Sequence, residues 1–254
     1  MQKVIVICGP TASGKTALSI ELAKKIGGEV VSADSMQIYD EMSIGTAKPD
    51  VEEMQGIKHY LVGNIAPTRR YSVSDYKSDA IKALEEIIEK NKTPIVVGGT
   101  GLYVNSLIYG IDYPEVETDL EYRKELEKVA EQKGLGYLYE EAKKIDPEAV
   151  KNISANDKKR IIRMLEIYKE TGKTKTQLEI ESRKNGVPYD YRVFAINMPR
   201  EILYDRINRR VDIMLEKGLI EEVKQLYKKY GDELRTSVQG IGYKEVIDYL
   251  NGMY

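Results

Sequence analysis

The sequence predicts an α/β fold, in which a parallel sheet flanked by helices carries an all-helical insertion domain. Three observations predict it: short apolar runs alternate with helical patterns early in the chain, residues 118–182 show helical patterns with no strand between them, and strand character returns at residue 192. Composition agrees, because 254 residues with 42% hydrophobic and 31% charged side chains can bury one sizeable core, or a core and a smaller lobe.

The first predicted elements are a strand, a loop and a helix. Val4 to Cys8 is a run of mostly β-branched apolar residues, typical of a buried strand. Thr16 to Ile26 has helical apolar spacing and stops at Gly27-Gly28, after which Glu29 to Ala33 forms a second strand that ends at Asp34.

A further helix and strand complete the early part of the chain. The S-x-x-D box from Ser72 to Asp75 opens a helix that runs to about Lys90. Pro94 to Val97 is a third strand, closed by Gly98-Gly99-Thr100-Gly101. Such alternation implies a parallel sheet with helices on both faces.

The middle of the chain is predicted to be helical. Thr118 and Glu121 form a T-x-x-E box before a helix near 119–133, another helix precedes Asp146-Pro147, and a longer one spans 157–171. Strand character returns over 192–198, and Pro199 starts a helix at its first turn. We therefore expect a core domain of residues 1–115 and 192–254, and a helical insertion of residues 116–191.

Composition excludes several kinds of site. One cysteine, Cys8, and one histidine, His59, rule out a disulfide framework, a Cys/His zinc site and a Cys-His nucleophilic pair, and His59 is expected to be structural. With no long apolar run and no signal-peptide pattern, we expect a cytoplasmic protein without membrane contact. The net charge is −2, yet residues 151–210 hold 15 Lys/Arg against 8 Asp/Glu, which suits a polyanion; solvated helix faces explain the same pattern.

Residues 9–16 read Gly-Pro-Thr-Ala-Ser-Gly-Lys-Thr and satisfy G-x-x-x-x-G-K-[ST], the P-loop motif of nucleotide-binding and ATP-binding proteins. The motif lies between a strand and a helix, so the fold is expected to be P-loop NTPase-like. Its glycines let backbone N–H groups surround phosphate oxygens, Lys15 reaches the distal phosphate, and the Thr16 hydroxyl is placed for Mg²⁺. The alternative is a chance match, and which molecule carries the phosphates stays open at this point.

The sequence departs from ordinary P-loop ATPases and GTPases, which hold Mg²⁺ with an Asp at the end of a later strand. Here Ile95-Val96-Val97 runs into Gly98 instead. The early carboxylate is Asp34, at the carboxyl end of the second strand, where open α/β sheets bind ligands. A base that accepts a proton from an incoming nucleophile belongs there. The competing interpretation is that Asp34 and Ser35 start a turn.

Six segments, in order along the chain, resemble the motifs of one family. They are Gly9–Thr16, Asp34–Tyr39, Ile44–Pro49, Gly98–Tyr103, Asn156–Arg163 and Gly240–Glu245. Together they resemble the tRNA dimethylallyltransferases. The resemblance implies transfer of a dimethylallyl group from its diphosphate to N6 of adenine-37 in tRNAs that read codons beginning with U, with release of diphosphate. It also implies a fold like a P-loop kinase, with a helical insertion that binds tRNA.

The resemblance implies roles for individual residues. The catalytic set would be Asp34 as the base toward adenine N6, Thr100 near the reacting centre, and Arg206 with Arg210 on the leaving diphosphate. Mg²⁺ would bind Thr16. The diphosphate would bind Gly9, Pro10, Thr11, Ala12, Ser13, Gly14, Lys15 and Thr16. The tRNA would contact Asp34, Ser35, Met36, Gln37, Thr100, Arg123, Lys159, Arg160, Ile161, Ile162, Arg163, Gln239, Gly240, Ile241, Gly242, Tyr243 and Lys244.

Physical arguments bear on some of these roles. Arg206 and Arg210 are four residues apart on a helix, so both can meet one anion, although paired exposed charges are the alternative. The basic residues of 158–163 suit RNA phosphates, and ordinary solvation is the alternative. Tyr39 or Tyr103 could stack a base, but core packing is the commoner use of such residues.

We expect a monomer whose partners are the tRNA anticodon stem-loop and dimethylallyl diphosphate. Two other classes stay open: a P-loop small-molecule kinase or a transferase that prenylates free adenine nucleotides, and a nucleotide-gated RNA-binding module without chemistry. The basic insertion argues against the first, and Asp34 with the arginine pair argues against the second. Members of the family usually continue past the Gly-Tyr-Lys-Glu stretch through a segment rich in Arg and Trp, whereas this chain ends at Tyr254. We expect full tRNA affinity to depend on such a segment.

Overall fold

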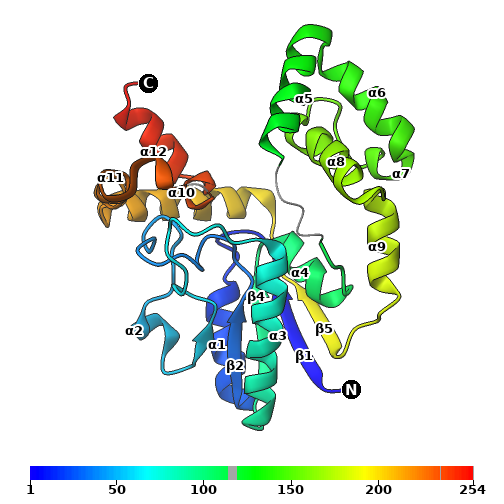
Figure 1. Ribbon diagram of the computed structural model, residues 1–254. Coiled ribbons are helices and arrows are strands. Elements are labelled where there is room, and N and C mark those ends of the chain that lie inside the picture. Colours follow the sequence, from blue (N-terminus) through cyan, green and yellow to red (C-terminus); the bar gives the residue numbers. More distant parts are fainter. Residues whose placement is uncertain (114–118, 235, 254) are drawn as a thin grey trace. The chain divides into compact units, whose positions relative to one another are not determined.

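The computed structural model describes residues 1–113, 119–234 and 236–253 (Figure 1). These residues form two compact units, residues 1–108 with 188–254, and residues 109–187. The predicted domain limit at residues 115 and 116 and the predicted capping residue Thr118 lie outside the described residues. The assignment of residues 116–191 to tRNA binding stays a prediction.

A five-stranded parallel sheet forms the centre of the first unit. Its strands have the order β3-β2-β4-β1-β5, and every pair is parallel. They are β1 (Lys3–Cys8), β2 (Gly28–Ser32), β3 (His59–Tyr60), β4 (Thr93–Gly98) and β5 (Asp190–Ala195). Cys8 aligns with both Gly98 and Ala195, so the loops after β1 and β4 leave the same edge of the sheet. The predicted α/β fold with a parallel sheet is confirmed.

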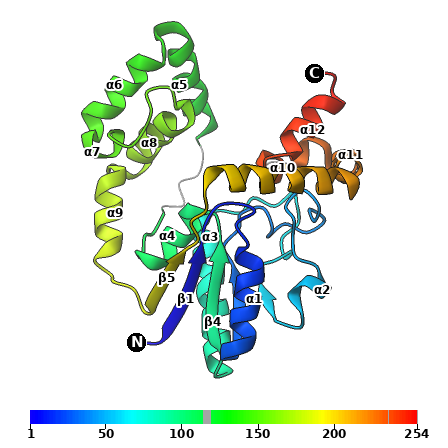
Figure 2. The same ribbon diagram turned by 180° about the vertical axis from the view of Figure 1, so that it is seen from behind.

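Helices cover both faces of this sheet, as predicted. The helices of the unit are α1 (Lys15–Ile26), α2 (Val51–Met54), α3 (Val73–Glu89), α4 (Gly101–Ile108), α10 (Arg200–Glu216), α11 (Leu219–Tyr230) and α12 (Tyr243–Leu250), with 3-10 turns at Gly231–Glu233 and Ser237–Gln239. Figures 1 and 2 show α1 and α3 on opposite faces of the strands. Ser72 caps α3 through the predicted box, because its hydroxyl accepts from the N–H of Asp75 while the Asp75 carboxylate accepts from the N–H of Ser72.

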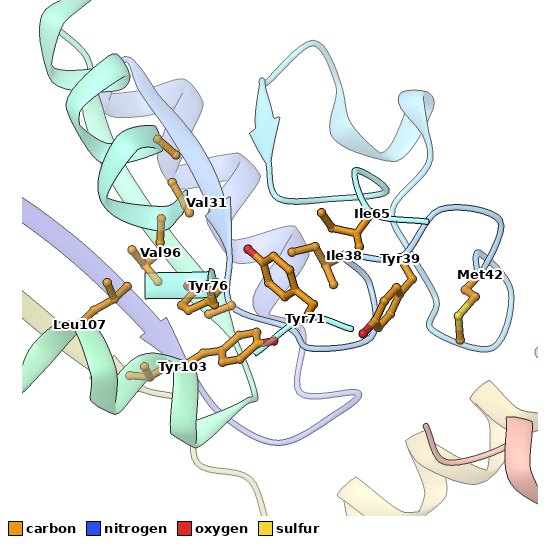
Figure 3. Packing of buried hydrophobic residues seen from close by; sticks show 14 of the residues in the cluster. Val31, Ile38, Tyr39, Met42, Ile65, Tyr71, Tyr76, Val96, Tyr103 and Leu107 are labelled. Carbon is orange, nitrogen blue, oxygen red and sulfur yellow. The ribbon is translucent and has the colours of Figure 1, made fainter. Parts of the chain in front are cut away.

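Alternate side chains of the strands face opposite layers, as the pleat requires. Val30 and Ile95 pack with Ala23 of α1, whereas Val31 and Val96 pack in a larger cluster with α3, α4, α11 and α12. Six buried tyrosines contribute to the larger cluster, and Figure 3 shows four of them, namely Tyr39, Tyr71, Tyr76 and Tyr103.

The tyrosines of the larger cluster are core residues. The rings of Tyr76 and Tyr103 stack with centroids 3.9 Å apart, and Tyr39 is fully buried. Tyr39 and Tyr103 therefore pack the core, the commoner of the two uses considered for them. His59 is half-buried, and its Nδ1 lies 2.9 Å from the carbonyl oxygen of Ile57, in keeping with a structural role.

Helices are the secondary structure of the second unit, and its described residues contain no strand, as the sequence predicts. Its helices are α5 (Leu120–Lys133), α6 (Leu135–Ile145), α7 (Pro147–Val150), α8 (Lys158–Thr171) and α9 (Lys175–Arg183). Asp119 caps α5 and Asp157 caps α8 with side-chain oxygens. Buried Asp146 ties α7 to α9, because it accepts from the N–H of Ala149 and from both the N–H and the hydroxyl of Thr176. Among the described residues, no helix combines the length and the apolar character needed to cross a bilayer.

Candidate active site

The P-loop connects β1 to α1 at the carboxyl edge of the sheet. Gly14 takes a left-handed conformation with φ 89° as the N-cap of α1, where a side chain would be strained. A Cβ on Gly9 would lie 3.1 Å from the backbone oxygen of Ile196, so the loop passes close to its neighbour. Ser13 is buried, and within the described residues its hydroxyl has no hydrogen-bond partner. A buried hydroxyl left without a partner beside a helix N-terminus is free to donate to an anion.

Lys15 folds back over the P-loop. Its Nζ donates to the carbonyl oxygens of Gly9 at 2.9 Å and Pro10 at 2.7 Å. Burial lowers the pKa of Lys15 below its ordinary value; the negative charge of Asp34 opposes this shift, and the positive charge of Arg210 adds to it. Lys15, Asp34 and Arg210 therefore share one electrostatic environment at the carboxyl edge of the sheet.

Asp34 follows β2 and is half-buried. Its Oδ1 accepts hydrogen bonds from the backbone N–H groups of Met36 at 2.9 Å and Gln37 at 3.2 Å. This is the turn that the competing interpretation predicts. Both bonds use Oδ1, however, so the turn orients the carboxylate and leaves Oδ2 available as a proton acceptor. The role of Asp34 as a base stays a prediction.

Two glycines at the end of β4 allow the P-loop and the Asp34 segment to approach one another. A Cβ on Gly98 would collide with the backbone of Ala33, and a Cβ on Gly99 would lie 3.3 Å from the carbonyl oxygen of Gly9. The position where other P-loop proteins carry an Asp is thus occupied by a residue that lets three chain segments pack backbone against backbone.

Thr100 joins the same segments with hydrogen bonds. Its N–H donates to the carbonyl oxygen of Ala33 at 3.1 Å. Its Oγ1 accepts from the N–H of Ser35 at 3.0 Å and donates to the hydroxyl of Ser35 at 3.3 Å. The structure thus brings together predicted residues that are 65 positions apart in the sequence.

The arginine pair lies on α10, and its two members differ in environment. Arg206 is exposed, whereas Arg210 is half-buried and donates from Nη2 to the carbonyl oxygen of Thr46 at 3.4 Å. Burial lowers the pKa of Arg210, and Asp34 opposes the shift. Its Nε is buried and has no hydrogen-bond partner in the part of the chain that the structure describes. An unsatisfied guanidinium N–H beside Lys15 is a ready donor to a phosphate oxygen.

The predicted tRNA-contacting residues of the first unit include the Asp34 turn and residues 239–244, and these two segments meet where Gly240 packs on Met36. Gln37 donates from Nε2 to the carbonyl oxygens of Thr46 at 3.2 Å and Ala47 at 3.1 Å. Gly240 packs on Met36, since a Cβ there would lie 2.9 Å from the Met36 sulfur. Within residues 239–244, Tyr243 is buried and Ile241 is fully in solvent.

The predicted residues of the second unit divide into exposed and buried ones. Lys159 and Arg160 are exposed on α8. The side chains of Ile161 and Ile162 are buried in the core of this unit, so only their backbone is left for a contact.

Arg123 and Arg163 share one carboxylate in the second unit. Arg123 forms two parallel bonds with Glu166, at 2.7 Å and 2.8 Å, while Nη1 of Arg163 lies 3.4 Å from the same carboxylate. Glu166 is 2% exposed, so it is a buried anchor that fixes both guanidiniums. Whether these arginines contact tRNA stays a prediction.

The residues present fit a magnesium ion whose ligands are mostly water and phosphate oxygens. Within the described residues, no group of three or more His, Cys, Asp or Glu could hold a metal. Mg²⁺ keeps waters and phosphate oxygens as most of its ligands, and one protein hydroxyl suffices beside them. Thr16 is exposed at the start of α1, where that hydroxyl is predicted.

Sequence reasoning assigned no role to Glu222 or to the loop of residues 43–47. The structure joins them, since the Glu222 carboxylate accepts from the backbone of this loop. The signal for this loop in the sequence is the segment Ile44–Pro49, which resembles a family motif but carries no predicted role.

Comparison with known proteins gives consistent matches over the chain. Residues 37–254 match the family described as IPP transferase. A protein of Acetivibrio thermocellus named tRNA dimethylallyltransferase is 52% identical over 252 residues, which are 99% of this chain and 80% of that protein. A protein of the same name from Halothermothrix orenii is 49% identical over 99% of this chain and 76% of its own length.

Solved structures show the same similarity. A tRNA isopentenylpyrophosphate transferase of Bacillus halodurans matches with a TM-score of 0.70 and 44% identity, covering 100% of this chain and 79% of that one. A eukaryotic dimethylallyltransferase acting on tRNA matches with a TM-score of 0.78 and 34% identity, covering 99% of this chain and 64% of that one.

Proposed function

The chain belongs to the IPP transferase family of tRNA dimethylallyltransferases, and we propose that it transfers a dimethylallyl group from dimethylallyl diphosphate to N6 of adenine-37 in tRNAs that read codons beginning with U. The observation that carries this proposal is the backbone packing of the P-loop, the segment that leads into Asp34 and the end of β4 at one edge of the sheet, where the charges of Asp34 and Arg210 both act on Lys15. That edge combines a cradle for an anion with a carboxylate that can take a proton.

The diphosphate is held by the residues of 9–16. The loop N–H groups, the free hydroxyl of Ser13 and the Lys15 ammonium contact its oxygens. Arg206 and Arg210 approach it from α10. As the allylic C–O bond breaks, negative charge grows on the leaving oxygen, and these cations stabilise it. Mg²⁺ on Thr16, when bound, neutralises further diphosphate charge.

Asp34 acts on the acceptor. A bond forms between adenine N6 and the allylic carbon while the bond from that carbon to diphosphate breaks. The proton that N6 loses passes to Oδ2 of Asp34, since Oδ1 is engaged in the turn. Thr100 holds Ser35 next to the catalytic carboxylate of Asp34. The adenine lies against a wall formed by Ser35, Met36 and Gln37.

The adenine reaches this edge only outside its stack. N6 of a base within a stacked loop cannot approach a carbon held in a P-loop, so the nucleotide is extruded toward Asp34 and Thr100. A helical insertion that binds the anticodon stem-loop, with Lys159 and Arg160 on phosphates, would supply the grip for extrusion. We propose that the enzyme works as a monomer in the cytoplasm, where this tRNA substrate occurs.

Incubation with labelled dimethylallyl diphosphate tests the proposal, with tRNA, AMP and ATP compared as acceptors under the same conditions. We expect label on tRNA alone. Preferred labelling of AMP or ATP would assign the chain to the transferases of free nucleotides. Labelling of none of the three, with tRNA binding intact, would identify an RNA-binding module without chemistry.

A further inference from the structure

The carboxylate of Glu222, in the first turn of α11, accepts four hydrogen bonds. Oε2 accepts from the backbone N–H groups of Ser43 at 2.9 Å and Ile44 at 2.8 Å. Oε1 accepts from the N–H of Gly45 at 3.1 Å and from the hydroxyl of Tyr243 at 2.6 Å. Bonds from N–H groups to a carboxylate are stronger than those to a neutral acceptor, so three successive N–H groups are fixed at once.

The loop that Glu222 fixes leads directly to the site. The carbonyl oxygen of Thr46 accepts from Nε2 of Gln37 at 3.2 Å and from Nη2 of Arg210 at 3.4 Å. The neighbouring carbonyl oxygen of Ala47 accepts from the same Gln37 amide at 3.1 Å. One carbonyl group is therefore shared between a residue of the adenine wall and a residue of the diphosphate clamp.

The loop has no room to shift on its other side. A Cβ on Gly45 would lie 2.5 Å from the ring of Tyr243 and 2.9 Å from the side chain of Leu219. Thr46 is buried, and its hydroxyl donates to the carbonyl oxygen of Met42 at 2.6 Å. The loop is thus pressed against α11 and α12, and Glu222 decides where its backbone lies.

We propose that Glu222 is a positioning residue for prenyl transfer. By fixing residues 43–45 it places the Thr46 carbonyl, which in turn holds Gln37 toward the adenine and Arg210 toward the diphosphate. Glu222 touches neither substrate, and the inference rests on the proposed function because that function assigns Gln37 and Arg210 their roles. The inference adds that Glu222 couples the adenine side of the site, through Gln37, to the diphosphate side, through Arg210.

The adjacent Glu221 provides a matched control. Both glutamates lie in the first turn of α11, where a negative charge is favourable to the helix. Glu221 is exposed and pairs with Lys224 and Gln225 of its own helix. Glu221→Ala therefore removes a charge from the same turn without touching the loop, whereas Glu222→Ala removes the acceptor of four hydrogen bonds.

The experiment measures kcat and KM for both substrates in Glu222→Ala, Glu222→Gln and Glu221→Ala, together with hydrogen exchange of the amides of residues 43–45. We expect kcat/KM of Glu222→Ala to fall about 10²-fold, since loss of alignment near 1 Å has that effect. KM for dimethylallyl diphosphate should rise as Arg210 loosens, and the three amides should exchange faster. Glu222→Gln keeps an acceptor oxygen and should lie in between, and Glu221→Ala should match the parent.

Each outcome has one meaning. If Glu222→Ala only unfolds in part, kcat should fall while both KM values stay unchanged, and that result would contradict the positioning role. Kinetics of Glu222→Ala equal to those of the parent would also contradict it. If Glu222→Ala does not fold, the same comparison of KM and amide exchange in Glu222→Gln decides. A parent enzyme that labels no tRNA would overturn the proposed function instead, and faster exchange at residues 43–45 would still establish the link from Glu222 to the loop.

Discussion

Replacing Asp34 by asparagine separates its two functions. In Asp34→Asn the side-chain oxygen can still accept from the N–H groups of Met36 and Gln37, so the turn is kept. The oxygen that would take the proton becomes an amide NH₂ group, which cannot act as a base. We expect turnover on tRNA to fall about 10²–10⁴-fold, the usual contribution of a general base. Affinity for dimethylallyl diphosphate should stay close to that of the parent, because the P-loop is unchanged.

Asp34→Ala removes the turn as well as the base. The two lost hydrogen bonds contribute about 0.5–1.5 kcal/mol each, so the free energy of unfolding should drop by about 1–3 kcal/mol. For a chain of this length that corresponds to a fall in Tm of about 2–12 °C, whereas Asp34→Asn should unfold near the parent temperature. Both variants should lose turnover alike, although only one loses stability.

The assay is single-turnover transfer of label from dimethylallyl diphosphate to tRNA, with thermal unfolding measured on the same samples. Single turnover excludes product release from the measured rate. If Asp34→Asn stays within about threefold of the parent rate, the assignment of Asp34 as the base is wrong. Asp34 would then serve the turn alone.

Three further predictions concern charged groups. The double change Lys159→Ala with Arg160→Ala should weaken tRNA binding and lower the slope of log affinity against log salt by about one for each lost phosphate contact; equal slopes in variant and parent would show a solvated face. Arg123→Ala leaves the Glu166 carboxylate buried and poorly paired, so we expect a loss of about 2–3 kcal/mol in calorimetric unfolding, below the range for fully buried pairs because the arginine is partly exposed; an unchanged Tm would refute it. Calorimetric diphosphate affinity should fall as pH rises through the pKa of Lys15, and because burial lowers that pKa the loss should begin at a lower pH than an ordinary lysine would give; Lys15→Arg should show no such loss, since its guanidinium stays charged.

Most of the helices and strands that can be predicted from the sequence are marked by patterns within a single segment of the chain. Strand β1, the P-loop and α1 follow from apolar runs, glycines and helical spacing within single segments, and the Ser72 box marks the start of α3. Strand β3 was not predicted, because two residues carry no periodicity; it forms since His59 and Tyr60 align with Val30 and Val31. Its existence depends on a partner far away in the chain.

The site residues also divide into those with a local sequence signal and those that depend on partners distant in the sequence. The P-loop and Asp34 are recognisable because their chemistry lies within a few residues and at a strand end. Glu222 was missed because the three backbone N–H groups that it binds are 177 to 179 positions away and the Tyr243 hydroxyl is 21 positions away, and nothing near it in the sequence distinguishes it from Glu221. Likewise, Glu166 and Arg123 are 43 positions apart, so spacing alone does not reveal the ion pair that fixes the arginine.

Prenyl transfer to an anticodon stem-loop tests the central claim most directly, when compared with a variant whose loop is closed by base pairing around the same adenine. The measured quantity is the rate of label transfer to that adenine, with its position verified by nucleoside mapping. We expect rapid transfer to N6 in the open loop and poor transfer in the paired one, because extrusion must then also break a base pair. Comparable rates on both, or an absolute preference for AMP over either RNA, would contradict the account.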